Sequence, residues 1–175
     1  FTLTSENRDA VARICTLLGG MPLALELAAS WTRVLNCDEI AEEIQRSIDF
    51  LALADRDMTP RHRSMRAVFD HSWSLLTEPE RQALAQLSIF RGGCRREAAL
   101  AVAHANLPVL ASLIDKSLLR KSQVGTITRY DMHELIRQYA EDQLRSTPST
   151  DEATQQRHGA YYLGLVGDRT AAIST

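Results

Sequence analysis

Residues 117–136 read S-L-L-R-K-S-Q-V-G-T-I-T-R-Y-D-M-H-E-L-I, and the fold follows from this stretch. Short runs rich in β-branched or aromatic residues lie on both sides of Gly125, which is the pattern of a β-hairpin. From Leu135 to Leu144 the apolar residues return at helical spacing, and this helix is expected to end before Thr147-Pro148. The stretch therefore predicts a hairpin followed by a helix.

Helical periodicity also precedes the hairpin. Apolar residues recur three and four positions apart over 65–76, and Thr77-Glu78-Pro79-Glu80 is typical of a capping box that opens the next helix. Gly92-Gly93 then breaks the chain, and two further short helices are expected over 96–103 and from 107 onward. About three helices followed by a hairpin is the order of a winged helix.

The N-terminal part predicts a small helical bundle. A first helix carries Val11, Ile14, Leu17 and Leu18 and stops at Gly19-Gly20. A second begins at Pro22 and presents one apolar stripe as far as Leu35. A third, capped by Asn36 or Asp38, places Ile40, Ile44, Ile48 and Leu51 on one face. The fold class is thus mainly α.

Linker composition over 54–60 places a domain boundary ahead of the winged helix, because Pro60 disfavours helix at the residue before it. The last segment carries Ala160, Tyr161, Tyr162, Leu163 and Leu165 in a helical pattern, with no partner helix left in the chain. The predicted domains are therefore 1–58, a helical subdomain; 59–147, a winged helix; and 148–175, a linker and the first helix of a helical-repeat region.

Composition excludes several classes of protein. Hydrophobic residues make up 45% of the chain and charged residues 24%, as in ordinary folded domains, and no apolar run is long enough for a membrane span. Cys15, Cys37 and Cys94 are too few and too widely spaced for a disulfide framework or a thiolate zinc site. A reducing, cytoplasmic location fits best, and a chain that begins at Phe1 reads as part of a longer protein.

Charge is distributed unevenly along the chain. Residues 1–59 carry a net charge of −5, residues 60–121 carry +5, and residues 122–175 carry −2. The middle block is the candidate anion-facing surface, although solvated helix faces explain the same pattern. With a total of −2, the chain lacks the basic excess of a general nucleic-acid binder.

The motifs of common enzymes are missing from the sequence. No G-x-x-x-x-G-K-[ST] phosphate loop occurs, so this chain alone is not expected to hydrolyse ATP. His133-Glu134 would need a second histidine at position 137 to form a zinc-protease motif, and that position holds Arg137. The histidines show no catalytic-triad spacing, so neither a catalytic residue nor a metal ligand is predicted.

Two features stand out as candidate binding residues. Gly20-Met21-Pro22-Leu23 leads from a glycine break into a proline-initiated helix and makes a rigid apolar corner that could pack on a flat ring. On chemistry alone, a tight turn between two core helices is the favoured explanation. His133 lies between a predicted strand and a predicted helix. The free N–H groups at the start of that helix would lie beside the imidazole and suit an anion. A simple capping or interface histidine is the alternative reading.

Taken together, Gly20-Met21-Pro22-Leu23 and Met132-His133-Glu134 resemble, in order and separation, the G-L-P-L and M-H-D motifs of the NB-ARC branch of the STAND signalling ATPases. The runs P-L-A-L-E-L-A-A-S-W, R-H-R-S-M-R-A-V-F-D-H-S-W, L-S-I-F-R-G-G and L-I-D-K-S-L-L-R resemble bacterial STAND regulators, many of them transcriptional regulators. The resemblance covers nearly the whole chain.

The resemblance implies that this chain holds the helical subdomain and winged helix of such a switch, without its P-loop domain. Pro22 would pack near the adenine of ADP and His133 would contact the β-phosphate, which latches the resting state; Glu134 stands where the plant-type motif has Asp, and no contact is assigned to it. ADP or ATP would bind only together with the upstream P-loop domain, a repeat domain would follow, and the activated protein could form homo-oligomers.

Two other functions remain open from the residues alone. A winged-helix DNA-binding module would read a duplex through the helix from Leu107 to Lys116, but Lys116 is the only base on that helix, so nucleic-acid binding is not expected. A pure protein-interaction scaffold would not need nucleotide to set its conformation.

Overall fold

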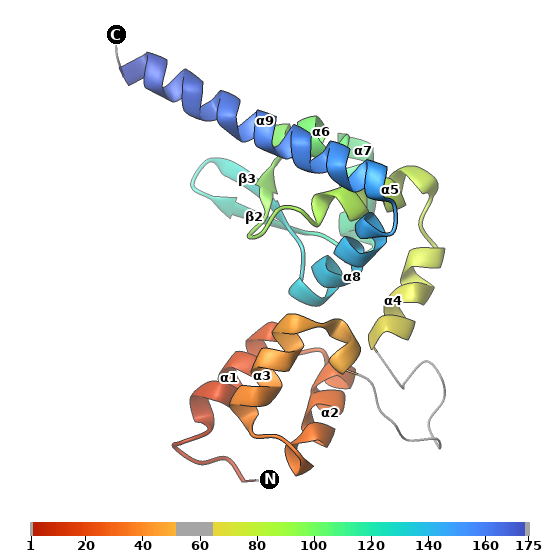
Figure 1. Ribbon diagram of the computed structural model, residues 1–175, viewed down its shortest axis with the longest axis vertical. Helices are drawn as coiled ribbons and strands as arrows, with labels where there is room; N and C mark the ends of the chain where they lie inside the picture. The colour runs from red at the N-terminus through yellow and green to blue at the C-terminus, as the bar shows by residue number, and fades with distance from the viewer. Residues whose placement is uncertain (1, 52–64, 174–175) are drawn as a thin grey trace. The chain divides into compact units, whose positions relative to one another are not determined.

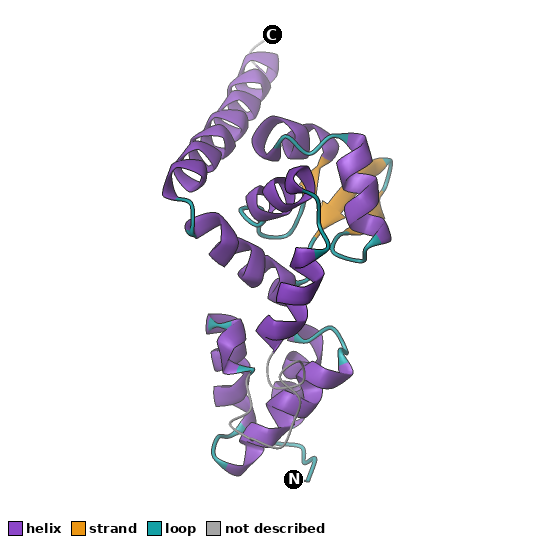
Figure 2. Ribbon diagram, turned by 90° about the vertical axis from the view of Figure 1, so that its right-hand side faces the viewer, coloured by secondary structure: helices purple, strands orange, loops and turns teal. Residues whose placement is uncertain are grey.

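The computed structural model describes residues 2–51 and 65–173. The chain forms two compact units, Phe1–Leu75 (unit 1) and Leu76–Thr175 (unit 2), because most contacts join residues of the same unit. Helices dominate both units, and all the strands of the described residues belong to unit 2 (Figure 2). The predicted linker over 54–60, and with it the boundary after residue 58, lies outside the described residues.

Unit 1 is built from α1 (Arg8–Leu17), α2 (Pro22–Ser30), α3 (Cys37–Arg46) and α4 (Met65–Ser74), with 3₁₀ turns at Trp31–Arg33 and Ile48–Phe50 (Figure 1). The start of α3 is a complete capping box, in which Glu39 N–H donates to Asn36 Oδ1 at 3.0 Å and Asn36 N–H donates to Glu39 Oε2 at 2.8 Å. Asn36, and not Asp38, is therefore the cap. Fully buried aliphatic side chains form the core: Leu18, Leu27, Ile40, Ile44, Ile48 and Leu51.

Two expected helices of unit 1 end earlier than their apolar stripes. The apolar stripe of the second helix was expected to run as far as Leu35, and this prediction is wrong beyond Ser30. There α2 tightens into a 3₁₀ turn, which leaves Val34 75% exposed. The third helix ends at Arg46, where Ser47 is extended. Ile48 and Leu51 are still buried, but on the 3₁₀ turn that follows and at its end.

Helix α4 belongs by its contacts to unit 1, whereas its sequence was assigned to the winged helix. Met65 N–H donates to Leu51 O at 3.1 Å, and the Arg66 guanidinium forms an ion pair with Asp49. The buried Met65 and Phe69 side chains add apolar contact on the same helix. Sequence proximity to the next helix therefore does not decide where α4 packs.

Unit 2 follows the winged-helix order. It begins with α5 (Glu78–Leu87), β1 (Cys94–Arg95), α6 (Arg96–Ala103) and α7 (Leu107–Asp115), and continues with the hairpin β2 (Arg120–Val124) and β3 (Ile127–Asp131). The sheet is antiparallel in the order β1-β3-β2, with Cys94 opposite Tyr130 and Lys121 opposite Tyr130 on the other side. The expected helical bundle, winged helix and hairpin are confirmed; β1 was missed, because two residues show no periodicity.

The turn that leads into β1 depends on two glycines with positive φ, Gly92 at 88° and Gly93 at 78°. A Cβ on Gly93 would lie 2.5 Å from Tyr130 O, so β1 can approach β3 only because this residue has no side chain. Arg129 of β3 holds the same turn, since its Nη2 donates to Gly92 O at 2.9 Å and to Gly93 O at 3.0 Å. The turn thus seats the third strand.

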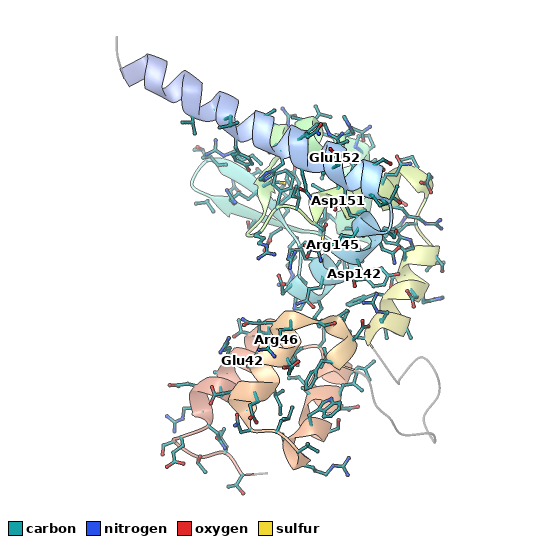
Figure 3. The ribbon with its side chains drawn as sticks, in the orientation of Figure 1. Glu42, Arg46, Asp142, Arg145, Asp151 and Glu152 are labelled. Atoms are coloured by element: carbon teal, nitrogen blue, oxygen red, sulfur yellow. The ribbon has the colours of Figure 1, made fainter. Side chains whose placement is uncertain are left out.

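Helices α8 (Glu134–Arg145) and α9 (Pro148–Ile173) complete unit 2. The expectation that the last helix has no partner in the chain is wrong, because α9 packs against α6 and α8. Its docking residues are polar and aromatic: Thr154 is fully buried, and Arg157 Nε donates to Val102 O of α6 at 2.8 Å. Asp151 and Glu152 lie near the start of α9 (Figure 3), where negative charge suits the helix dipole.

Candidate functional site

The Gly20-Met21-Pro22-Leu23 corner joins α1 to α2 in unit 1. Gly19 and Gly20 both adopt positive φ, 56° and 71°, and Gly20 N–H donates to Cys15 O at 3.3 Å, which ends α1. Met21 is extended and serves as the N-cap of α2, so Pro22 occupies the first helical position, where its missing N–H costs nothing. The corner is a tight interhelical turn in its geometry.

The same corner also presents part of itself to the surface of unit 1. Gly20 and Pro22 are exposed, and Met21 and Leu23 are half-buried, whereas Ala24 and Leu27 of the following turns are fully buried. Buried residues therefore fix the direction of α2, and the proline ring stays accessible. The first turn of α2 also has N–H groups without an acceptor in its own helix.

His133 is the N-cap of α8 in unit 2. Its Nδ1 accepts a hydrogen bond from Leu135 N–H at 3.2 Å, and its carbonyl accepts from Arg137 N–H at 2.9 Å. The side chain is half-buried. His133 therefore does cap the helix, and capping uses only one of the two ring nitrogens.

Burial lowers the pKa of His133 below its usual 6.5, the positive charge of Arg120 lowers it further, and Asp131 and Glu134 oppose the shift. The imidazole is therefore neutral at pH 7. Since Nδ1 accepts from a backbone N–H, the single ring proton must lie on Nε2. The site offers one N–H donor beside the positive end of a helix, with a guanidinium nearby.

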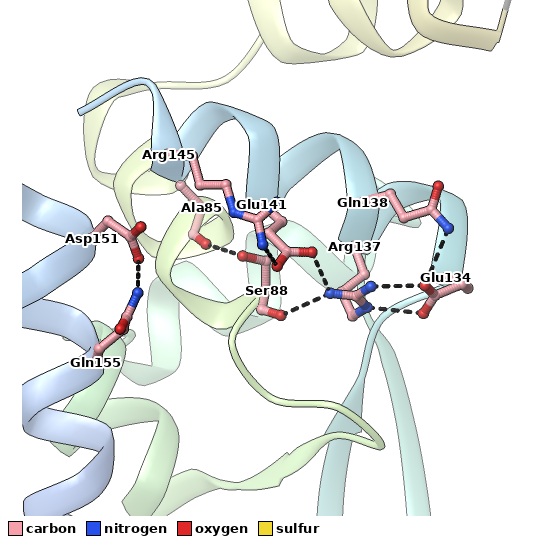
Figure 4. Close-up of polar contacts among 9 residues, drawn as sticks. All are labelled: Ala85, Ser88, Glu134, Arg137, Gln138, Glu141, Arg145, Asp151 and Gln155. Carbon is pink, nitrogen blue, oxygen red and sulfur yellow. Dashed lines mark hydrogen bonds and ion pairs between the residues drawn. The ribbon is translucent and has the colours of Figure 1, made fainter. Parts of the chain in front are cut away.

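Glu134, the acid next to His133, is engaged within α8 (Figure 4). Arg137 Nε and Nη2 donate to its two carboxylate oxygens at 2.8 and 2.7 Å, and Arg137 Nη1 donates to Glu141 at 2.8 Å. Arg137 is only 8% exposed, and these two acids hold its pKa above the usual value. The position that would be a metal ligand in a zinc protease is thus a buried structural arginine.

The residues that the structure describes contain no group of three or more His, Cys, Asp or Glu side chains able to hold a metal ion. Among the same residues, no single helix is long and apolar enough to span a membrane. Helices α6 and α7 pass that test of length and composition only as a pair, and they are bent by 104° relative to each other.

Helix α7 takes the place of the recognition helix in the winged-helix order, but Lys116, the basic residue at its C-cap, is engaged inside unit 2. Lys116 Nζ lies 2.7 Å from both carboxylate oxygens of Glu80, which is 6% exposed, and Ser112 donates to the same carboxylate. These bonds lower the pKa of Glu80 to about 2, with Lys116 as the largest cause. Exposed Leu107, Ala111 and Asp115 offer no cation to a phosphate backbone.

The two candidate features thus lie in different units, the Gly20–Leu23 corner in unit 1 and His133 in unit 2. Each has the local geometry expected of it, and their meeting at one ligand stays a prediction. Arg120 belongs to the basic block over 60–121 that is the candidate anion-facing surface, but the sequence did not connect it with His133. The register that pairs Arg120 with Asp131, two residues before His133, was the signal that could have found it.

No model of a known protein family matches the chain. A Mycobacterium tuberculosis protein named as an HTH-type transcriptional regulator is 36% identical over 172 residues, which cover 94% of this chain and 19% of the relative. The regulatory protein AfsR of Streptomyces coelicolor is 28% identical over 169 residues, 89% of this chain and 16% of the relative. The chain therefore spans less than a fifth of the length of these relatives.

Among solved structures, a STAND protein with a tetratricopeptide-repeat sensor from Pyrococcus horikoshii matches with a TM-score of 0.48 and 19% identity, over 81% of this chain and 21% of that one. By its sequence relatives, and along nearly its whole length, the chain is similar to one part of much larger bacterial regulatory proteins.

Proposed function

We propose that the chain is the regulatory part of a STAND-type, NB-ARC-like ATPase switch in a bacterial transcriptional regulator. In this role it helps to bind ADP and to hold the resting state. The nucleotide binds only together with a P-loop domain that precedes the chain in the parent protein. One relative named as a transcriptional regulator and another named as a regulatory protein support the regulatory setting, and the local geometry of His133 supports the nucleotide role.

The observation that carries the proposal is the orientation of the His133 ring. Capping consumes Nδ1 as an acceptor, and burial keeps the ring neutral, so Nε2 is left as a hydrogen-bond donor. A phosphate oxygen is a strong acceptor for such a donor, and the adjacent helix N-terminus favours negative charge. The positive charge of Arg120, which lowers the pKa of the ring, attracts the same anion.

The corner at Pro22 supplies the second contact of the proposal. An exposed proline ring, fixed at the first position of α2 and supported by the buried Ala24 and Leu27, is a rigid apolar surface that suits the face of an adenine. No ligand contact is assigned to Glu134, whose carboxylate is already paired with Arg137.

The switch itself is a shift between two populations. ADP that contacts the P-loop domain, Pro22 and His133 stabilises the closed arrangement by its extra affinity for it. Exchange for ATP, assisted by a signal at a downstream repeat domain, releases the winged helix and permits assembly into oligomers. This chain, which has no phosphate loop of its own, supplies two contacts and no hydrolysis.

The test uses the full-length regulator with its P-loop domain and compares His133→Ala, His133→Asp and His71→Ala. Loss of one hydrogen bond to a charged group is expected to speed ADP release about tenfold or more in His133→Ala. Asp is a good N-cap and repels phosphate, so His133→Asp should release ADP at least as fast with α8 intact. His71, exposed on α4, is the control.

Release of a fluorescent ADP analogue, followed by stopped flow, measures the effect, and circular dichroism verifies that each variant is folded. Equal release rates in all three variants and the parent would refute the nucleotide role of His133. Nucleotide that never alters the conformation of the full-length protein would favour the protein-interaction scaffold.

A further inference from the structure

Unit 2 contains a groove of about 470 Å³ between α9 and the β1–β3 edge of the sheet, separate from His133. Helix α9 runs along α6 and past the strands (Figure 1) and forms one wall. The wall residues are Tyr161, Tyr162, Leu165 and Val166 of α9, and the strands contribute Arg95 and Arg129. This volume lies in the range of sites that take a small ligand or a few side chains of a peptide.

The wall formed by α9 is held firmly against the rest of unit 2. Arg157 bonds both to Val102 O of α6 and, at 3.0 Å, to Gln86 Oε1 of α5. One turn further on, the His158 and Tyr162 rings lie with their centroids 5.2 and 6.5 Å from that of the buried Phe90. The groove is therefore preformed, and binding does not need to order its wall.

Apolar and aromatic surface on this wall remains open to solvent. Tyr162 is 38% exposed, Leu165 39% and Val166 63%, and all three line the groove. A run of exposed apolar side chains beside a groove is the usual mark of a binding surface. The apolar surface alone does not identify what the groove binds, but the charges around it do.

The charges of the groove are positive and lack carboxylate partners among the described residues. Among the described residues, the Arg95 side chain forms no hydrogen bond or ion pair, and Arg129 donates through Nη2 to Gly92 O and Gly93 O. Glu97 is the one acid in the groove lining, and its Oε1 lies 3.6 Å from Nε of Arg96, with which it forms an ion pair. The groove thus joins an apolar wall to two guanidinium groups.

We propose that this groove binds an acidic, apolar segment of a partner protein, whose carboxylates contact Arg95 and Arg129 and whose apolar side chains lie on Leu165 and its neighbours. Guanidinium groups recognise carboxylates in a bidentate manner, and exposed tyrosines give contact area at low entropic cost. The surface would allow unit 2 to receive a protein signal independently of nucleotide.

The experiment measures fluorescence anisotropy of a short labelled peptide of Glu and Leu residues, titrated with the whole 175-residue chain. Arg95→Glu is expected to weaken binding about tenfold, and a peptide with Lys in place of Glu should recover affinity for that variant. Leu165→Ser should weaken binding to a similar degree. Lys121→Glu, an equal charge change at an exposed residue of β2 outside the groove, is the control.

Two results would overturn the proposal. Equal losses in Arg95→Glu and Lys121→Glu, or no saturation at millimolar chain, would mean that the peptide meets only general positive charge. Competition by free phosphotyrosine as effective as that of the unlabelled peptide would assign the groove to a small aromatic anion instead. Unchanged thermal unfolding of Arg95→Glu verifies that any loss of affinity does not come from misfolding.

Discussion

Gly93→Ala, compared with Gly92→Ala, tests how closely β1 approaches β3. Both glycines have φ in the left-handed region, at 78° and 88°, so each alanine variant carries the same kind of backbone penalty. The surroundings differ: a Cβ on Gly92 meets nothing within 4 Å, whereas one on Gly93 lies 2.5 Å from Tyr130 O. The pair therefore separates backbone strain from the steric clash.

The expected magnitudes follow from these two terms. A left-handed conformation costs a non-glycine residue about 1 to 2 kcal/mol, which is the whole effect predicted for Gly92→Ala. In Gly93→Ala the Cβ collides with backbone, and so β1 must move away from Tyr130 and weaken the bonds of Arg129 to the turn. Overpacking of this kind adds about 1 to 3 kcal/mol. Unit 2 of Gly93→Ala should lose about 3 kcal/mol.

Urea denaturation can report on the two units separately, because their chromophores are segregated. Both tryptophans, Trp31 and Trp73, lie in unit 1, and all four tyrosines lie in unit 2. Tyrosine absorbance should show the lowered midpoint of Gly93→Ala, and tryptophan fluorescence should keep its midpoint in both variants. Equal destabilisation of unit 2 by the two alanines would refute the close approach of β1 to β3.

Three further outcomes are expected. Lys116→Met leaves the Glu80 carboxylate buried without its cation and should destabilise unit 2 by about 2 kcal/mol at pH 7 by tyrosine-monitored denaturation. The difference from the parent should shrink as pH falls from 4.5 to about 2 and disappear below that, because folded Glu80 becomes protonated only below its pKa of about 2. Burial lowers the pKa of His133 and of His158, so the stability that each contributes is complete above pH 6.5 and decreases below it; denaturation of His158→Gln should show a shallower fall in this range. Asn36→Ala removes the capping box of α3 and should lower the stability of unit 1 by about 1 kcal/mol, seen by tryptophan fluorescence and not by tyrosine absorbance.

Much of the fold could be predicted because its signals are local. The capping box at Thr77, the hairpin around Gly125 and the cap at Asn36 depend on residues at most a few positions apart. Strand β1 could not be predicted, since two residues carry no pattern and pair only when a turn with two glycines brings them to Tyr130. The docking of α9 escaped for a similar reason, as its anchor, Arg157, bonds to a carbonyl 55 residues away.

The candidate site, too, was predicted only in part from the sequence. Sequence alone indicated that Pro22 begins a helix and that His133 stands between a strand and a helix, and the structure places both there. The protonation of His133 depends on burial and on Arg120, a strand residue that no motif connects to it. The meeting of Pro22 and His133 at one nucleotide is a prediction from resemblance, for the two residues lie in separate units.

Periodicity, capping residues and turn glycines thus determined which segments are helical, because these effects act over three or four neighbouring residues. Tertiary structure alone decided which polar groups meet: Lys116 with a buried Glu80 36 residues away, and Arg129 with the turn before β1. From the sequence alone, each of these side chains would be expected to be an exposed charge. Whether it holds the core together or remains available to a ligand depends on what the folded chain brings within hydrogen-bonding distance.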